Sequence, residues 1–161
     1  MASDVKRIPD GYHTVTPSIA VTSGVAALEF YKRALGAEIV NSMTTPDGSM
    51  LAHAEIRIGD SIIFVSDEYP DMDHKSPATL GGSPVSFYLY VEDADASFDK
   101  AVAAGATSVR PMQDMFWGDR LGTVADPYGH KWTFSTHVKD MTLEEVEEAS
   151  KEFFSQTQGA A

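Results

Sequence analysis

The chain has 161 residues, enough for one domain that buries roughly 70% of its unfolded surface around a core of its own. Its formal net charge of −12 repels phosphate backbones and anionic lipids, so we expect neither nucleic acid nor a membrane as a partner. Cysteine is absent, which excludes disulfides, thiolate metal ligands and a cysteine nucleophile. No run reaches the roughly 18 apolar residues of a membrane span and no signal peptide is visible, so we expect a cytoplasmic protein.

The first half of the chain predicts a strand, a helix and a hairpin, followed by a linker. The strand rests on period-two alternation and the hairpin on two short runs divided by Gly59-Asp60. The helix rests on apolar spacing with Gly36 as its stop, and the linker on frequent Pro, Gly and Asp. The predicted ranges are 14–22 for the strand, 24–35 for the helix, 52–58 and 61–66 for the hairpin, and 69–84 for the linker.

The second half predicts the same order of elements. Asp93 is a suitable N-cap for its helix, and Gly105 ends that helix as Gly36 ends the first. The predicted ranges are 85–91 for the strand, 94–104 for the helix, and 121–125 and 131–136 for two strands around a turn. Beyond them, Thr142 and Glu145 form a capping box that opens an acidic helix at 142–154.

These two halves repeat one another. The matching positions are Val21 with Val91, Gly36 with Gly105 and Gly59 with Gly129, at offsets of 70, 69 and 70. We therefore predict an α+β domain made of two βαβββ modules, at residues 14–68 and 85–137. One helix covers only one face of each sheet, so two such mixed sheets side by side should enclose a cleft.

Four stretches of the chain carry a resemblance to a known family. They are TVTPSIAV…ALEFYKRALGA, HAEIRIGDSIIFVSDE, PVSFYLYVEDADASF and FWGDRLGTVADPYGHKWTFSTH. Over about residues 9–150 the chain resembles the PhnB-like branch of the glyoxalase/bleomycin-resistance/dioxygenase (vicinal oxygen chelate) superfamily. The resemblance implies tandem βαβββ modules, a homodimer and a small-molecule ligand. It does not select an activity, because members include isomerases, dioxygenases and antibiotic-binding proteins without catalysis.

The resemblance also implies where a divalent metal would be held. Catalytic members use His, Gln or Glu at four strand positions, which here are Thr16, Ile63, Ser86 and Thr133. None of these side chains is a competent ligand, so we expect no metal in the standard place and no other cofactor. A divalent metal remains possible only with relocated ligands, for example His53 and Glu55 with a residue of the second module.

The strand at 52–58 carries the row of polar residues that is most suggestive of catalysis. Alternation directs Ala54, Ile56 and Ile58 toward the helix and His53, Glu55 and Arg57 toward the cleft. On this hypothesis, Glu55 is a general base and His53 a proton shuttle, while Arg57 contacts the ligand. The alternative interpretation is an internal ion-pair ladder or a solvent-facing strand edge.

Further ligand-binding candidates share the predicted cleft-facing side or the loop above it: Thr16, Ser18, Ser86, Tyr88, Tyr90, Trp117, Arg120 and Thr133. Trp117 and Arg120 would form an aromatic wall with a cation. Alternatively, Trp117 fills the core and Arg120 pairs with Asp119 or Asp126. We expect His137 at the surface and a structural hydrogen bond from His130.

Three functions are compatible with these features. The first is a metal-independent protein that binds or sequesters a small organic molecule, which the missing ligands and the aromatic residues favour. The second is an isomerase, lyase or dioxygenase-like enzyme that uses Glu55 and His53. The third is a metalloenzyme with relocated ligands.

Overall fold

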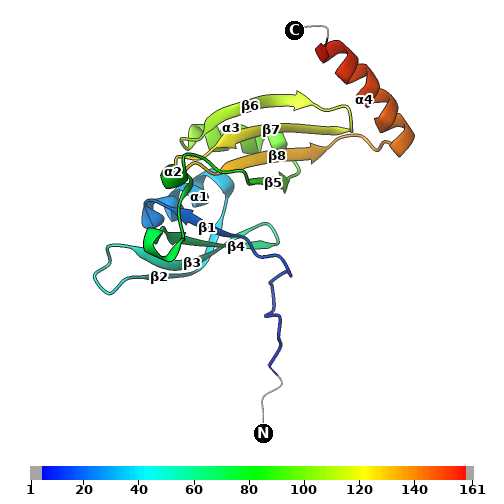
Figure 1. Ribbon diagram of the computed structural model, residues 1–161. Helices are drawn as coiled ribbons and strands as arrows, with labels where there is room; N and C mark the ends of the chain where they lie inside the picture. Colours follow the sequence, from blue (N-terminus) through cyan, green and yellow to red (C-terminus); the bar gives the residue numbers. More distant parts are fainter. Residues whose placement is uncertain (1–4, 159–161) are drawn as a thin grey trace.

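The computed structural model describes residues 5–158, which form two βαβββ modules and a C-terminal helix (Figure 1). The first module consists of β1 (Ser18–Val21), α1 (Gly24–Leu35), β2 (Glu38–Thr44), β3 (Leu51–Ile58) and β4 (Ser61–Asp67). The second consists of β5 (Ser86–Tyr90), α3 (Ala94–Ala103), β6 (Thr107–Asp114), β7 (Asp119–Ala125) and β8 (Lys131–His137). Between the modules lie η1 (Pro70–Met72) and α2 (Pro77–Leu80), and α4 (Leu143–Gln158) follows the second module.

The two sheets have the same topology. Their strand orders are β1-β4-β3-β2 and β5-β8-β7-β6, and the first pair in each is parallel while the others are antiparallel. The fold is therefore α+β with two tandem modules, as the repeat predicted. Because a single helix covers each sheet, each sheet keeps one face free of helix, and we call this its open face.

The helices begin and end where local sequence signals place them. Gly36 ends α1 in the left-handed conformation, at φ 66°, which costs a glycine little because it has no Cβ. Asp93 caps α3 by accepting a hydrogen bond from the backbone N–H of Ala96 at 2.9 Å. The predicted helices at 24–35 and 94–104 agree with the structure to within one residue.

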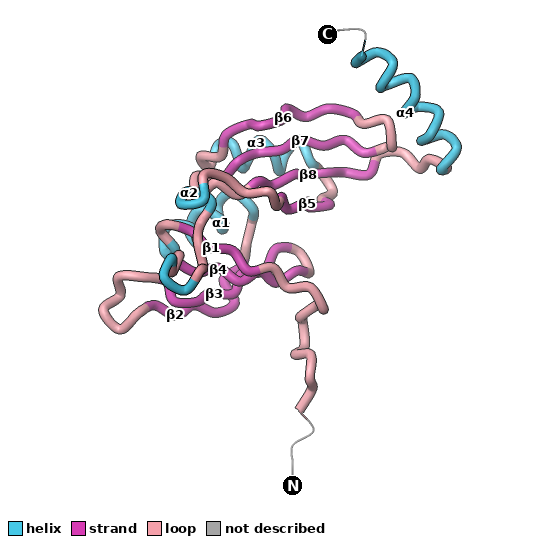
Figure 2. Tube along the Cα trace, in the orientation of Figure 1, coloured by secondary structure: helices cyan, strands magenta, loops and turns pink. Residues whose placement is uncertain are grey.

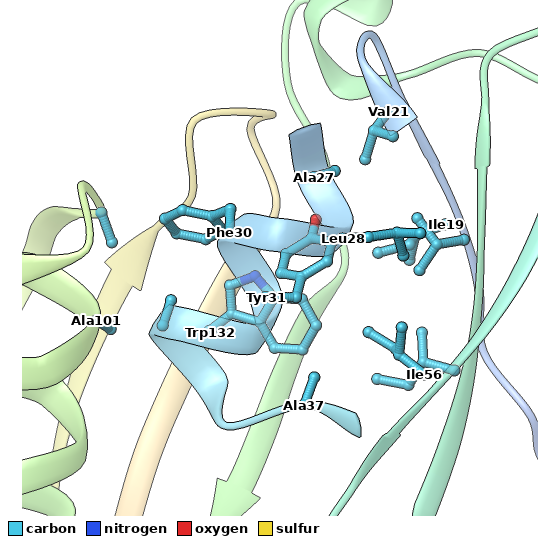
Figure 3. Packing of buried hydrophobic residues seen from close by; sticks show 14 of the residues in the cluster. Ile19, Val21, Ala27, Leu28, Phe30, Tyr31, Ala37, Ile56, Ala101 and Trp132 are labelled. Carbon is cyan, nitrogen blue, oxygen red and sulfur yellow. The ribbon is translucent and has the colours of Figure 1, made fainter. Parts of the chain in front are cut away.

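A single core joins the modules, because α1 contacts α3 as well as its own sheet. Figure 3 shows Tyr31 of α1 beside Trp132 of β8, and their ring centroids are 5.6 Å apart in an edge-on arrangement. On the same face of the second sheet, Phe87 stacks on Trp132 at 4.6 Å. The aromatic contacts of Trp132 thus connect the helix of one module to the sheet of the other.

A buried carboxylate secures this junction. Asp126 is 5% exposed and accepts hydrogen bonds from the Tyr31 hydroxyl at 2.8 Å and the Trp132 indole N–H at 2.9 Å. It also accepts the backbone N–H groups of Tyr128 and His130, both at 2.9 Å, which shapes the turn. His130 bonds the backbone oxygen of Ala20 through Nε2 at 2.9 Å, so its predicted structural role is confirmed.

Helix α4 extends away from the second sheet, and the N-terminal segment before β1 leaves the first sheet in a different direction (Figure 2). The predicted capping box is present, since Thr142 Oγ1 accepts the Glu145 N–H at 3.2 Å and the Glu145 carboxylate accepts the Thr142 N–H at 2.7 Å. None of the helices within residues 5–158 has the length and apolarity needed to cross a bilayer.

Candidate functional site

A cleft of about 670 Å³ lies between the two sheets. Its lining consists of His13, Val15 and Pro17 before β1, residues 58–63 around the β3–β4 turn, residues 87–91 on β5, and Trp132 of β8. The volume lies within the range of roughly 300–1,000 Å³ that small-molecule sites occupy. Both modules contribute to this cleft, but it lies along the edge strand β5 and includes Phe87 and Trp132 of the helix-covered face, so it is not the space between the two open faces that the sequence predicted.

The cleft is predominantly apolar and aromatic. Besides two tyrosines, its ionisable side chains are Asp60 and His13, and none of the described residues that line it is Lys or Arg. Of the predicted ligand-binding residues, Tyr88 and Tyr90 take part in the lining. Both are on β5 and point to the open face of the second sheet, where they are 46% and 68% exposed.

On that open face, the same two tyrosines converge on a carboxylate that is only 3% exposed, Asp119 at the start of β7. Its Oδ2 accepts hydrogen bonds from the hydroxyls of Tyr88 at 3.3 Å and Tyr90 at 3.1 Å, and from the indole N–H of Trp117 at 3.2 Å. Its Oδ1 is 2.8 Å from Nδ1 of His137. We call these five residues the Asp119 cluster.

The hydrogen bonds of the Asp119 cluster favour the ionised form of Asp119. Burial by itself raises the pKa of Asp119, but hydrogen bonds from His137, Tyr90 and Trp117 outweigh it and hold the pKa below its usual value. The carboxylate is therefore an acceptor only, and each neighbouring hydroxyl donates to it. The bond to Asp119 in turn raises the pKa of Tyr90.

His137 lies between two carboxylates. While Nδ1 contacts Asp119, Nε2 is 3.0 Å from Asp140, and donation through both nitrogens requires the imidazolium form. The bond to Asp119, followed by that to Asp140, raises the pKa of His137. His137 was expected at the surface, and its side chain is indeed 51% exposed, but it is also part of this network.

A second polar cluster lies on the open face of the first sheet. Glu55 accepts a hydrogen bond from the Tyr12 hydroxyl at 2.5 Å, and His53 Nε2 is 3.4 Å from the other Glu55 oxygen. The bond to Glu55 raises the pKa of Tyr12. Because Ala54 and Ile56 are fully buried on the helix side, the predicted alternation of β3 is confirmed. Neither His53 nor Glu55 is among the residues that line the cleft.

Both arginines of the predicted site are ion-paired away from the cleft. Arg57 bonds Glu38 of β2 at 3.2 Å. Arg120 bonds both oxygens of Asp95 on α3, at 2.6 and 2.7 Å, and its partners are thus Asp95 and Asp114 rather than Asp119 or Asp126. Since successive residues of β7 point to opposite faces, Asp119 faces the open side and Arg120 the helix, away from Trp117.

The remaining predicted positions do not fit a metal ion. The Thr16 hydroxyl donates to the His13 carbonyl at 3.1 Å, the Thr133 hydroxyl is 2.8 Å from that of Thr123, and Ile63 belongs to the core. Ser18 and Ser86 are exposed strand residues. Across residues 5–158, no three His, Asp or Glu side chains form a group that could hold a metal ion.

Sequence reasoning missed Asp119 as a site residue. It selected Tyr88, Tyr90 and Trp117, but considered Asp119 only as a partner for Arg120. The feature that identifies it is the register of β7 with β8, which puts Asp119 opposite His137 and both side chains on the face of the tyrosines. That register is not visible in the alternation of either strand by itself.

Comparison with known proteins agrees with this architecture. Residues 12–134 match the Glyoxalase/Bleomycin resistance protein/Dioxygenase superfamily. An uncharacterized protein of Mycobacterium bovis is 37% identical over 138 residues, which cover 84% of this chain and 90% of the relative. A crystal structure of an Arabidopsis thaliana gene product has a TM-score of 0.62 at 29% identity, over 77% of this chain and 98% of that one.

A PhnB protein from Bacillus cereus shares the fold, with a TM-score of 0.59 at 16% identity over 77% of this chain and 99% of its own. The family match covers most of the chain, and the similar M. bovis protein extends over nearly the same part of it. The chain therefore belongs to the glyoxalase/bleomycin-resistance/dioxygenase superfamily.

Proposed function

We propose that this protein binds a small organic ligand in the cleft between its two modules, without a metal in the family's standard place. The observation that carries the proposal is the cleft itself: about 670 Å³, lined by both modules and predominantly apolar. A concave apolar site with a few polar groups is the usual form of a small-molecule site.

The lining supports a ligand with an apolar, planar body. Partly buried Phe87 lines the cleft and stacks on the buried Trp132 behind it, and Leu89 and Val91 extend the apolar surface along β5. A neutral or cationic ligand fits better than an anionic one, because Asp60 lines the cleft and the chain carries a net charge of −12. The two arginines that might have favoured an anion are paired elsewhere.

The test is a substitution that fills the cleft without disturbing the core. Val15 lines the cleft yet is 80% exposed, so Val15→Trp should fold normally and occupy ligand space. We expect the wild type to bind the neutral fluorescent probe N-phenyl-1-naphthylamine saturably, and Val15→Trp to weaken binding by about tenfold or more. Fluorescence titration measures the dissociation constants.

The matched control is Val109→Trp on β6, which is 52% exposed and does not line the cleft. It should bind the probe as the wild type does. If both variants lost the same affinity for the probe, or if Val15→Trp lost none, the probe would bind outside the cleft and the proposal would be refuted.

A second candidate function, acid–base catalysis, is favoured by the contacts of Glu55 with Tyr12 and His53. Such a cluster could abstract a proton next to a carbonyl group. If so, the protein should catalyse hydrogen–deuterium exchange of hydroxyacetone in D₂O, and Glu55→Gln should slow the exchange by about a hundredfold or more. Proton NMR follows the reaction, with Glu38→Gln on β2 as the control. An unchanged rate in Glu55→Gln would exclude this function.

A further inference from the structure

The hydroxyls of the two cleft tyrosines are held by a carboxylate that is itself buried. Tyr88 and Tyr90 are 46% and 68% exposed, but their hydroxyls are both bonded to Asp119, which is 3% exposed and therefore closed to a ligand. We propose that Asp119 and His137 are positioning residues of the cleft, holding these tyrosines in its wall and coupling ligand affinity to the protonation of His137. This inference rests on the proposed binding function.

Asp119 is suited to this role because its position is itself well determined. Four side chains donate to it, and they come from β5, β8 and the turn before β7. Tyr88 has a second restraint, since its hydroxyl is also 3.0 Å from that of Ser135, which is fully buried. An exposed tyrosine without such bonds samples several rotamers, and ordering it on ligand binding weakens affinity. Asp119 orders both rings in advance.

His137 supplies the positive charge that balances Asp119. The ionisable groups facing it are Asp119 from β7 and Asp140 from the segment after β8, and Tyr88 and Tyr90 from β5 reach it through Asp119. Lys139, two residues further along the chain, instead adds its charge to the Thr142 hydrogen bonds that lower the pKa of Glu145.

The direction of the pH dependence follows from these contacts. Two carboxylates favour the imidazolium form, so His137 keeps its proton to higher pH than an unperturbed histidine does. At pH values below the pKa of His137, the charge-assisted bond to Asp119 is at full strength. As the pH rises through this pKa, His137 becomes neutral and can donate a hydrogen bond through one nitrogen only. The charge of the buried Asp119 carboxylate is then less compensated, and the two tyrosines are held less firmly.

The first arm of the test is a double-mutant cycle on the dissociation constant of N-phenyl-1-naphthylamine. Asp119→Asn keeps the size of the side chain but has one acceptor oxygen, and it should weaken binding by about five- to tenfold. In the background Tyr88→Phe with Tyr90→Phe, the same change should alter affinity by less than about twofold, because the hydroxyls through which Asp119 acts are gone. General destabilisation would not produce this difference between backgrounds.

The second arm is the pH profile. The probe stays neutral between pH 6 and pH 9, so a change in affinity reports on the protein. Wild-type affinity should fall severalfold across this range, whereas His137→Gln should show a flat profile. His74→Gln is the matched control, because this histidine bonds Ser66 and lies apart from the Asp119 cluster, and it should keep the wild-type profile. The His137 arm does not depend on Asp119→Asn being stable.

The outcomes separate this inference from the binding function. The binding function stands if the wild type binds the probe saturably and Val15→Trp weakens that binding. The positioning role is nevertheless overturned if Asp119→Asn changes the affinity equally in both tyrosine backgrounds, or if the affinity does not depend on pH. No saturable binding by the wild type, or binding that Val15→Trp leaves unchanged, overturns both.

Discussion

Replacement of Asp126 by alanine should lower the free energy of unfolding by about 3–5 kcal/mol. The Tyr31 hydroxyl and the Trp132 indole N–H both donate to this carboxylate, and both side chains are at most 1% exposed. Without an acceptor, each donor stays buried and unsatisfied at a cost of about 1–3 kcal/mol. The turn also loses the acceptor of two backbone N–H groups. Urea denaturation measures the change, provided the slope is unchanged.

Two variants calibrate this result. Asp71→Ala, in the exposed η1 turn, removes a carboxylate with no buried partner and should change stability by about 0.5 kcal/mol or less. Tyr31→Phe removes one donor and leaves Asp126 its other three bonds, so its effect should fall between the two. A loss below about 1 kcal/mol for Asp126→Ala would show that water or a rearranged turn replaces the carboxylate, and that it does not secure the junction.

Trp132→Ala should be comparably severe, with a loss of about 3–5 kcal/mol. Trp132 is 1% exposed and packs against Phe87 on its own sheet and Tyr31 on the other module, so its truncation opens a cavity where the modules meet. Asp126 also loses one of its donors. Because Trp132 lines the cleft as well, probe binding should weaken together with stability.

The control is the other tryptophan of the chain. Trp117 is only partly buried, in the turn before β7, and its indole N–H bonds Asp119. Trp117→Ala should therefore cost less than about 2 kcal/mol. Equal losses for the two tryptophans would contradict the view that the junction between the modules is the more important of the two sites for stability.

The two open faces carry different chemistry. On the second sheet, the buried carboxylate of Asp119 bonds two tyrosines that line the cleft. On the first sheet, Glu55 contacts Tyr12 and His53, and none of the three lines the cleft. With four side-chain donors around it, Asp119 serves to hold other groups. Glu55 has one hydroxyl donor and a histidine nitrogen at 3.4 Å, so fewer groups occupy its oxygens, and the test of catalysis is directed at this residue.

Local sequence patterns were enough to predict the helices and strands and their order along the chain. Helix α1 begins and ends where apolar spacing and Gly36 place it, and the capping box of α4 is formed as its residue pattern predicts. The offset of 70 between Val21 and Val91 indicated two modules of one topology. These features depend on residues close together in the chain, or on a pattern that the chain repeats, so they can be recognised without knowing which segments meet.

The site depended on contacts between distant residues. Asp119 takes its donors from Tyr88 and His137, and Asp126 pairs with Tyr31, 95 residues away. Arg120 was placed beside Trp117 because the two are near each other in sequence, but the pleat of β7 turns it toward Asp95 on α3. Strand register and the packing of α1 against the second sheet decide which polar groups are buried together. Neither follows from residue spacing, because many registers satisfy the same alternation, and only burial of the shared core selects one of them.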